Sequence, residues 1–463
     1  MRILFASSEV APFSKTGGLG DVAFALPRAL AARGHEVLVL SPLYGCVDRE
    51  RHGLSLAGEA LGGRVWVAPG QKPRFAFWES ASHFDRPGIY GYGGDYPDNA
   101  ARFVAFSKSL LPAARALGFQ PEVVHLNDWQ TAAATLFSEG IPTVLTIHNL
   151  GYQGLFPLDE ARHLFGGAPP PAAWLHHGQL GLLKGGILTA DLITTVSPTH
   201  AREIRETELG FGLGEPLRRR GDRLVGILNG IDTEIWDPAT DPHLPAHFSR
   251  ADPSGKAACK RALQQELGLA ADDGALLLGV VSRIAGQKGF DILLPALDAL
   301  FERRVQLAVL GEGDEAMVAT LQSWAKRRPD RLVLRVGFFE GLAHRIYAGA
   351  DALLMPSSYE PCGLAQLYAL RYGTVPVVRA TGGLRDTVRE GETGFSFEAY
   401  RPEALLAAVD RALATFADRG AWEAMVDRAM AEDHSWDRSA AAYEQAYAEL
   451  FRGGIFAHPP SPW

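Results

Sequence analysis

A glycine-rich loop with a single lysine follows the first apolar run of the chain. The run covers residues 3–6, and Lys15, Gly17 and Gly18 precede a helix-like pattern that begins near Asp21. Glycines let the backbone approach a ligand closely, and the N–H groups and dipole of a helix N-terminus favour an anion. This order of residues indicates a phosphate site. A strand-to-helix turn that carries glycines for steric reasons alone is the alternative.

Two cations lie five residues apart on a second loop. Arg283 and Lys288 belong to residues 282–289, directly after the apolar run 276–281. Ligands of α/β folds bind at the carboxyl ends of strands. A rigid guanidinium fork and an ammonium point charge together suit a diphosphate. An ordinary solvated loop is the alternative.

A carboxylate and a pair of glycines follow two later apolar runs. Glu360 comes after the run 352–355 and ahead of a predicted helix that ends at Tyr372. It is either a helix-capping acid or a buried acceptor for sugar hydroxyls, with the N–H groups of residues 362–364 completing the site. Residues 381–383 repeat the strand, glycine turn and helix after the run 375–378. The three loops together indicate a phosphorylated ligand.

Two other patterns limit the cofactors that we expect. Residues 311–316 match the dinucleotide pattern G-x-G-x-x-A, but three carboxylates in that loop would repel a pyrophosphate. We therefore predict a tight turn there and no nicotinamide cofactor.

No Asp-x-Asp pair occurs in the sequence. We expect no metal, and the charge of a leaving group would fall to protein cations and helix ends.

The elements that must position these residues alternate in a regular way. Short apolar runs alternate with helix-period segments twice, which is typical of parallel sheets buried on both faces. A passage rich in Pro and His, residues 237–245, is typical of a linker. We expect two doubly wound α/β domains that face each other across a deep cleft. The predicted domains are 1–243 and 244–438, followed by a helix and tail at 439–463 with Tyr443, Tyr447 and Phe451 on one stripe. The predicted strands are 3–6, 37–40, 123–126, 143–147 and 192–196, and then 276–281, 305–310, 332–336, 352–355 and 375–378.

Composition narrows the class of protein. A chain of 463 residues is too long for one ordinary core. The net charge of −8 argues against a nucleic-acid partner. The three cysteines are far apart and lack metal spacing, which suits a reducing compartment. Because the sequence shows neither a signal-peptide pattern nor a membrane-length apolar run, we expect a cytoplasmic protein without a membrane partner.

Seven motifs occur in the order found in bacterial glycogen synthases and plant starch synthases. They are residues 15–22, 125–129, 146–150, 229–232, 282–289, 360–364 and 381–384. The chain resembles this family from Met1 to about Leu450. The resemblance implies a GT-B fold with two Rossmann-like domains, a C-terminal helix that packs back on the first domain, and no cofactor. It also implies transfer of glucose from ADP-glucose to the non-reducing-end 4-hydroxyl of an α-1,4-glucan such as glycogen, with retention of configuration.

The resemblance assigns roles residue by residue. It makes Glu360 the carboxylate that holds glucose hydroxyls and supports an oxocarbenium-like transition state. Arg283 and Lys288 match the pair that neutralises the departing ADP, and His148 matches a histidine beside the anomeric centre. The donor-binding positions are Lys15, Gly17, Gly18, Asp21, Asp128, Asn229, Phe338, Cys362, Gly363, Leu364, Thr381, Gly382 and Gly383, with Phe338 packed against adenine. A satisfied strand-end histidine and a helix cap are the alternatives for His148 and Asp128.

The sequence departs from the family's pattern in one motif. The family often has His-Asp-Trp-His where residues 127–130 read Asn-Asp-Trp-Gln, so no imidazole is available at positions 127 and 130.

UDP-glucose is the alternative donor. A glucan- or nucleotide-binding protein without turnover is a different class, against which the set of Arg283, Lys288 and Glu360 argues. A pyridoxal-phosphate phosphorylase would need a lysine that holds the cofactor covalently.

Overall fold

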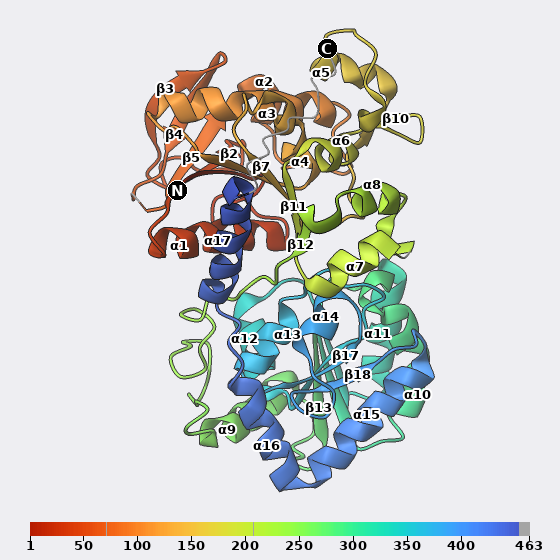
Figure 1. Ribbon diagram of the computed structural model, residues 1–463. Coiled ribbons are helices and arrows are strands. Elements are labelled where there is room, and N and C mark those ends of the chain that lie inside the picture. Colours follow the sequence, from red (N-terminus) through yellow and green to blue (C-terminus); the bar gives the residue numbers. More distant parts are fainter. Residues whose placement is uncertain (71, 207, 453–463) are drawn as a thin grey trace. The chain divides into compact units, whose positions relative to one another are not determined.

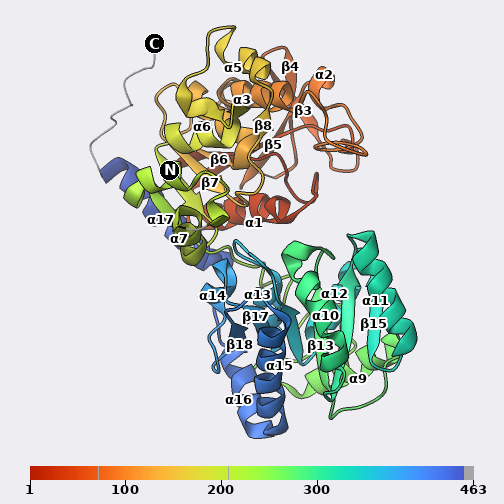
Figure 2. The same cartoon turned by 90° about the vertical axis from the view of Figure 1, so that its right-hand side faces the viewer.

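The computed structural model describes residues 1–70, 72–206 and 208–452. The chain forms two compact units, which Figures 1 and 2 show from two sides. The first unit comprises Met1–Asn229 and the C-terminal segment that begins at Trp436, and the second comprises Gly230–Ser435. The chain therefore passes between the units twice, after Asn229 and after Ser435. Both crossings come before the domain boundaries at residues 243 and 438 that the sequence predicted.

The first unit is built on a nine-stranded sheet. Its order is β12-β11-β7-β6-β1-β2-β5-β4-β3, parallel from β12 to β5 and antiparallel at the β5-β4-β3 edge. All five strands predicted in this half are present. The strands are β1 (Arg2–Ala6), β2 (Glu36–Pro42), β3 (Ser55–Ala60), β4 (Gly63–Val67), β5 (Arg74–Glu79), β6 (Val123–Asn127), β7 (Thr143–Ile147), β11 (Leu192–Thr195) and β12 (Leu224–Gly226), and a small separate sheet contains β8 (Leu155–Phe156), β9 (Leu175–His176) and β10 (Gln179–Gly181).

The helices of the first unit cover both faces of this sheet. They are α1 (Gly18–Ala32), α2 (Ala81–Phe84), α3 (Asn99–Ala116), α4 (Asp128–Ala132), α5 (Arg162–Phe165), α6 (Leu182–Thr189), α7 (Pro198–Glu206), α8 (Gly214–Arg219) and α17 (Trp436–Arg452). Helix α17 lies beside α1 in the same hydrophobic cluster (Figure 1). Tyr443 and Tyr447 are fully buried there, so the predicted return of the C-terminal helix to the first unit is what the structure shows. Phe451, predicted on the same stripe, is 43% exposed near the end of the helix.

The second unit is built on a six-stranded parallel sheet of order β15-β14-β13-β16-β17-β18. This is the strand order of the doubly wound dinucleotide-binding fold. Alternate residues of β13 enter two hydrophobic clusters, Leu276 and Leu278 on one face and Leu277 on the other. The strands are β13 (Leu276–Val281), β14 (Val305–Gly311), β15 (Leu332–Val336), β16 (Ala352–Met355), β17 (Val375–Arg379) and β18 (Phe395–Phe397). The helices are α9 (Ser254–Leu267), α10 (Phe290–Leu300), α11 (Glu315–Arg327), α12 (Glu340–Gly349), α13 (Ala365–Arg371), α14 (Gly382–Thr387), α15 (Pro402–Ala417) and α16 (Arg419–Met430).

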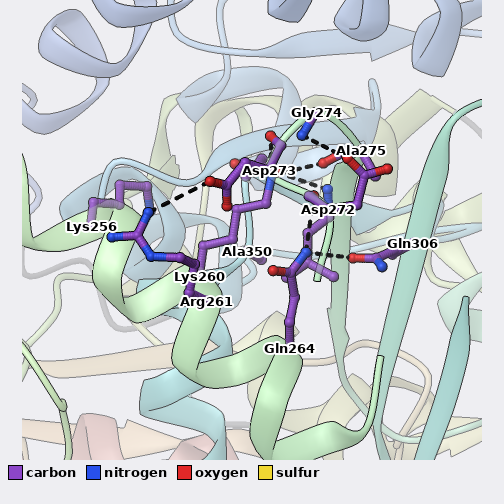
Figure 3. A network of polar contacts seen from close by, with 12 residues as sticks. Lys256, Lys260, Arg261, Gln264, Asp272, Asp273, Gly274, Ala275, Gln306 and Ala350 are labelled. Atoms are coloured by element: carbon purple, nitrogen blue, oxygen red, sulfur yellow. Dashed lines mark hydrogen bonds and ion pairs between the residues drawn. The ribbon is translucent and has the colours of Figure 1, made fainter. Parts of the chain in front are cut away.

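A polar network attaches the first helix of the second unit to its sheet (Figure 3). Lys260 Nζ donates to the carbonyl of Ala275 at 2.7 Å and to Asp351 Oδ2 at 2.6 Å. Gln264 Nε2 donates to Gln306 Oε1 at 2.8 Å, next to the start of β14 (Figure 3). Because Lys260 is buried, its ammonium depends on these acceptors. The network therefore holds α9 next to the amino-terminal ends of the strands, away from the carboxyl ends where ligands bind.

The predicted linker is part of the packed structure of the second unit. Asp241 is buried and accepts hydrogen bonds from Tyr372 Oη at 2.5 Å and His344 Nδ1 at 2.7 Å. The Trp236 ring stacks on His344 with centroids 3.8 Å apart. The interpretation of 237–245 as a linker was wrong, because contacts with distant residues fix the buried Asp241 within the second unit, although five of the nine residues are exposed.

The rejected dinucleotide motif forms a tight turn, as predicted. A Cβ atom at Gly311 or Gly313 would collide with the carbonyl oxygens of Ser282 and Ile284. Asp314 caps α11, since its side chain accepts from the backbone N–H of Met317 at 2.9 Å. The glycines serve close backbone packing. None of the described helices is long and apolar enough to cross a membrane.

Candidate functional site

The glycine-rich loop of the first unit connects β1 to α1, with Gly17 at the N-cap and Gly18 as the first helical residue. Lys15 Nζ lies 2.7 Å from Asp21 Oδ1, and the two side chains are 42% and 37% exposed. The structure therefore brings these two predicted residues together at the surface. An exposed ion pair of this kind contributes little to folding, so its ammonium can exchange partners readily.

Glu9 organises this loop, and the sequence analysis missed it. Its Oε2 accepts the backbone N–H groups of Thr16 at 2.6 Å and Gly17 at 3.1 Å. Its Oε1 accepts the hydroxyls of Thr16 at 2.7 Å and Tyr90 at 2.6 Å. The Gly17 N–H that the sequence suggested for a phosphate is thus bonded to a carboxylate. Glu9 is only 3% exposed, and its place just after a buried strand was the signal available in the sequence.

A second polar group follows β6 and β7 of the same unit. Asp128 Oδ1 accepts the backbone N–H of His148 at 2.7 Å, and His148 Nε2 lies 2.8 Å from Asn127 Oδ1. Asp128 adopts φ +56° and does not cap α4 with its side chain, so the cap alternative was wrong. The structure thus joins two predicted residues, Asp128 and His148, from adjacent strand ends.

Burial sets the protonation of this group. Burial raises the pKa of Asp128 to about 7, against the lowering effect of the N–H groups of His148 and Asn149. The nearby Glu9 charge adds to the rise. Burial lowers the pKa of His148 to about 4, so its imidazole is neutral at pH 7. His125 behaves likewise between Tyr447 and Thr146, with its pKa lowered to about 3 by burial.

Asn229 lies at the last position of the first unit before the chain enters the second. Its side chain is buried, and Oδ1 has no hydrogen-bond partner within the part of the chain that the structure describes. A buried amide oxygen without a partner costs free energy, so this atom is suited to accept from a ligand.

In the second unit, the predicted cations and carboxylate line one cavity of about 230 Å³ at the carboxyl ends of β13 and β16. Lys288 Nζ donates to Glu360 Oε2 at 2.6 Å, and Ser357 Oγ donates to the same oxygen at 3.1 Å. Arg283 is exposed and donates to Gln287 Oε1 at 2.9 Å. The cavity is lined by Val281, Ser282, Arg283, Lys288, Leu354, Met355, Ser357, Glu360, Gly363, Leu364 and Ala365.

The glycines after β17 support the Glu360 loop from behind. Gly382 adopts φ +45°, and a Cβ atom there would collide with the Glu360 carbonyl. Gly383 donates its N–H to that carbonyl at 3.1 Å, and a Cβ atom on it would collide with Cys362. Cys362 and Thr381 are buried beside this contact. Within the described residues, these four positions hold the loop rather than line its cavity.

Phe338 lies outside that cavity lining, on the loop between β15 and α12. Its side chain is 75% exposed. Gly337, at φ +124°, precedes it and donates to the Gly311 carbonyl at 3.2 Å. An exposed aromatic ring on a fixed loop at the carboxyl edge of the sheet is available to stack on a planar ligand.

Comparisons with known proteins show the family of this chain. The family model of the starch synthase catalytic domain matches residues 2–219, and that of glycosyl transferases group 1 matches residues 265–423. The glycogen synthase of Anaeromyxobacter sp. (strain Fw109-5) is 50% identical over 97% of this chain and 99% of that protein. The chain belongs to the glycogen and starch synthase family. Another relative, the glycogen synthase of Syntrophotalea carbinolica, is 45% identical over 99% of this chain and all of that protein.

Solved structures support the fold of this glycogen and starch synthase family member. The catalytic domain of starch synthase IV from Arabidopsis thaliana, bound to ADP and acarbose, aligns with a TM-score of 0.86 at 31% identity. It covers 97% of this chain and 99% of that chain. A sucrose-phosphate synthase from Thermosynechococcus elongatus, 19% identical with a TM-score of 0.64, shares the fold. The protein is therefore a glycosyltransferase with the predicted GT-B fold.

Proposed function

We propose that this enzyme transfers glucose from ADP-glucose to the non-reducing-end 4-hydroxyl of an α-1,4-glucan, with retention of configuration. The observation that carries the proposal is the cavity of the second unit, where Arg283, Lys288 and Glu360 meet. A protein that only binds glucan or nucleotide has no need to place two cations beside a buried carboxylate. The relative from Arabidopsis binds ADP and acarbose, which supports this donor and acceptor class.

The two cations are proposed to neutralise the departing ADP. Lys288 and Glu360 compensate each other, with side chains only 19% and 8% exposed. A diphosphate that enters the cavity competes for the Lys288 ammonium, and Arg283 adds a fork of donors that is already exposed. Charge that develops on the leaving group is then met by groups held in place beforehand.

Glu360, His148, Asp128 and Asn229 are the polar groups proposed to contact the sugar. Glu360 accepts glucose hydroxyls and stabilises positive charge at the anomeric carbon. His148 and Asp128 contribute a neutral imidazole and a carboxyl group whose pKa lies near 7. Asn229 offers its unpartnered amide oxygen.

The nucleotide is proposed to bind with its diphosphate at Arg283 and Lys288 and its base at Phe338. Stacking of adenine on the exposed Phe338 ring gives the base a platform. In the first unit, Lys15, Asp21 and the backbone at Gly18 are proposed to contribute to donor binding, while Gly17, whose N–H is bonded to Glu9, supports the loop. In the second unit, Gly363 and Leu364 line the cavity, while Cys362, Thr381, Gly382 and Gly383 support its loop.

Glucan labelling tests the proposal. Purified enzyme is incubated with glycogen and either ADP-[14C]glucose or UDP-[14C]glucose, and the polymer is then digested with an enzyme specific for α-1,4 linkages. We expect label from ADP-glucose, released by that digestion, and the same rate in the presence of EDTA. Preferential use of UDP-glucose would change the donor, and nucleotide binding without label transfer would show a binding protein.

A further inference from the structure

Asn127 and His148 form a fixed pair at the ends of β6 and β7. Asn127 is fully buried, and its side-chain amide makes two hydrogen bonds of opposite kind. Nδ2 donates to the carbonyl of Ala6 at 2.9 Å, and Oδ1 lies 2.8 Å from His148 Nε2. A backbone carbonyl only accepts, so the amide NH₂ must face Ala6 and its oxygen must face the imidazole.

The Asn127 backbone is equally constrained. Ala6 pairs with Leu126 in the parallel ladder between β1 and β6, which fixes the position of its carbonyl. Thr131 Oγ1 accepts the N–H of Asn127 at 2.6 Å and donates to the Asn127 carbonyl at 2.8 Å. The side chain therefore has no freedom to turn its amide around without losing both bonds.

This orientation decides which nitrogen of His148 carries the proton. An amide oxygen only accepts, so the neutral ring must carry its hydrogen on Nε2. The other nitrogen, Nδ1, then holds a lone pair, and no hydrogen bond reaches it among the described residues. The backbone N–H of His148 is held by Asp128 Oδ1 at 2.7 Å, so the backbone of His148 is anchored by Asp128 and its ring by Asn127.

We propose that Asn127 is a positioning residue that locks His148 in the Nε2–H tautomer, so that Nδ1 meets the substrate only as a hydrogen-bond acceptor. A hydroxyl group of the transferred sugar is the chemical class that such an acceptor takes. The functional half of this inference rests on the proposed glucosyl transfer, whereas the tautomer does not.

The same argument accounts for the departure from the family at position 127. A neutral histidine offers one donor and one acceptor, as the Asn127 amide does, so either residue can bridge Ala6 and His148. Aspartate offers acceptors only and cannot donate to the Ala6 carbonyl. Leucine has a similar size and offers neither. These three substitutions separate hydrogen-bonding pattern from volume.

Nitrogen NMR of the full-length protein labelled with [15N]histidine tests the tautomer directly, with His148→Gln used to assign the signals. We expect His148 to show a protonated Nε2 and an unprotonated Nδ1 from pH 8 to pH 5. Asn127→His keeps this pattern, Asn127→Leu mixes the tautomers, and Asn127→Asp makes the ring protonate within that range. A proton on Nδ1 in the unmodified protein would overturn the proposal, whatever its activity.

Kinetics test the functional half. We expect Asn127→Leu and Asn127→Asp to lower kcat by about 10- to 100-fold, the range found when a partner that orients a histidine is removed. KM for the donor should change less, the kcat–pH profile of Asn127→Asp should shift, and Asn127→His should retain activity. Circular dichroism confirms that each variant is folded. Unchanged kcat in the folded Leu and Asp variants, with altered tautomers, would show that catalysis does not depend on the tautomer of His148.

Discussion

Lys288 is partly buried against the buried Glu360 carboxylate, whereas Arg283 is exposed, and this difference decides which substitution is the cleaner test. Arg283→Ala removes a cation without leaving a buried partner unpaired. We predict that it lowers kcat by about 10²- to 10³-fold, the usual cost of losing one electrostatic stabiliser of a developing charge. Lys288→Ala should lose as much turnover and also lower the unfolding temperature, because Glu360 is left buried without its cation.

Full activity in Arg283→Ala would contradict the assignment of this loop to the diphosphate. Glu360→Gln provides a matched comparison, since it keeps the shape and removes the charge. We expect kcat to fall far more than the affinity for ADP, which calorimetric titration measures. If ADP binding is lost while turnover per bound donor is kept, Glu360 belongs to the nucleotide.

A substitution of Glu9 tests the role of this side chain in the glycine-rich loop. Glu9→Ala removes the acceptor of two backbone N–H groups and two hydroxyls, so the loop from Thr16 to Gly17 loses its anchor. We expect a rise in KM for the donor of about tenfold, which corresponds to about 1.4 kcal/mol, a typical worth of a hydrogen bond to a charged group. Tyr90→Phe removes one of the four donors and should raise KM by less. Equal effects of the two substitutions would contradict an anchoring role.

The sequence placed together three residues that line one cavity of the second unit, whereas it missed the contacts of Glu9 in the first unit. Arg283, Lys288 and Glu360 lie in loops directly after apolar strands, so local sequence located them. Glu9 and Asn127 act through partners that are distant in sequence, such as Tyr90 and Ala6. Their roles depend on strand order, which a single sequence does not reveal.

At the scale of elements, burial decided what the sequence could predict. All ten predicted strands are present in the two sheets, and nine of them are largely buried, whereas β15 is an edge strand with exposed residues at its end. The strands β3, β4 and β5 at one edge of the first sheet were missed, and β3 is mostly exposed and carries few apolar residues. The segment 237–245 was misassigned because Asp241 is buried by partners more than 100 positions away in the chain.

Asp241 gives a prediction about this segment. Asp241→Ala leaves Tyr372 Oη and His344 Nδ1 buried without their acceptor, so we expect the free energy of unfolding to fall by about 2–5 kcal/mol. Asp237→Ala is the matched control, because Asp237 pairs with Arg371 nearer the surface and should cost about 0–1 kcal/mol. Urea denaturation followed by tryptophan fluorescence measures both. A cost for Asp241→Ala as small as the control would mean that the segment is loosely attached.

At the scale of the whole molecule, buried histidines make the first unit sensitive to mild acid. Burial lowers the pKa of His83, His125, His148 and His176, and all four belong to the first unit. The first unit should therefore respond to mild acid.

The direction follows from the proton balance. Below pH 6.5 an unfolded histidine binds a proton, while His125 in the folded unit stays neutral down to about pH 3. The stability from His125 is complete above pH 6.5 and falls by up to about 1.4 kcal/mol per pH unit below it. Asp128 acts oppositely, because its pKa is raised to about 7 and the folded state binds the proton first. The histidines outnumber it, so the first unit should lose stability between pH 6.5 and pH 5.

Differential scanning calorimetry from pH 7.5 to pH 5 tests this sensitivity, and Asp241→Ala identifies which transition belongs to the second unit. We predict that the first unit's transition moves to lower temperature between pH 6.5 and pH 5, because unfolded histidines bind protons there while the buried histidines stay neutral. Asp128→Asn removes the opposing group and should make the first unit's loss steeper. A first-unit transition that stays in place or moves to higher temperature would contradict the prediction.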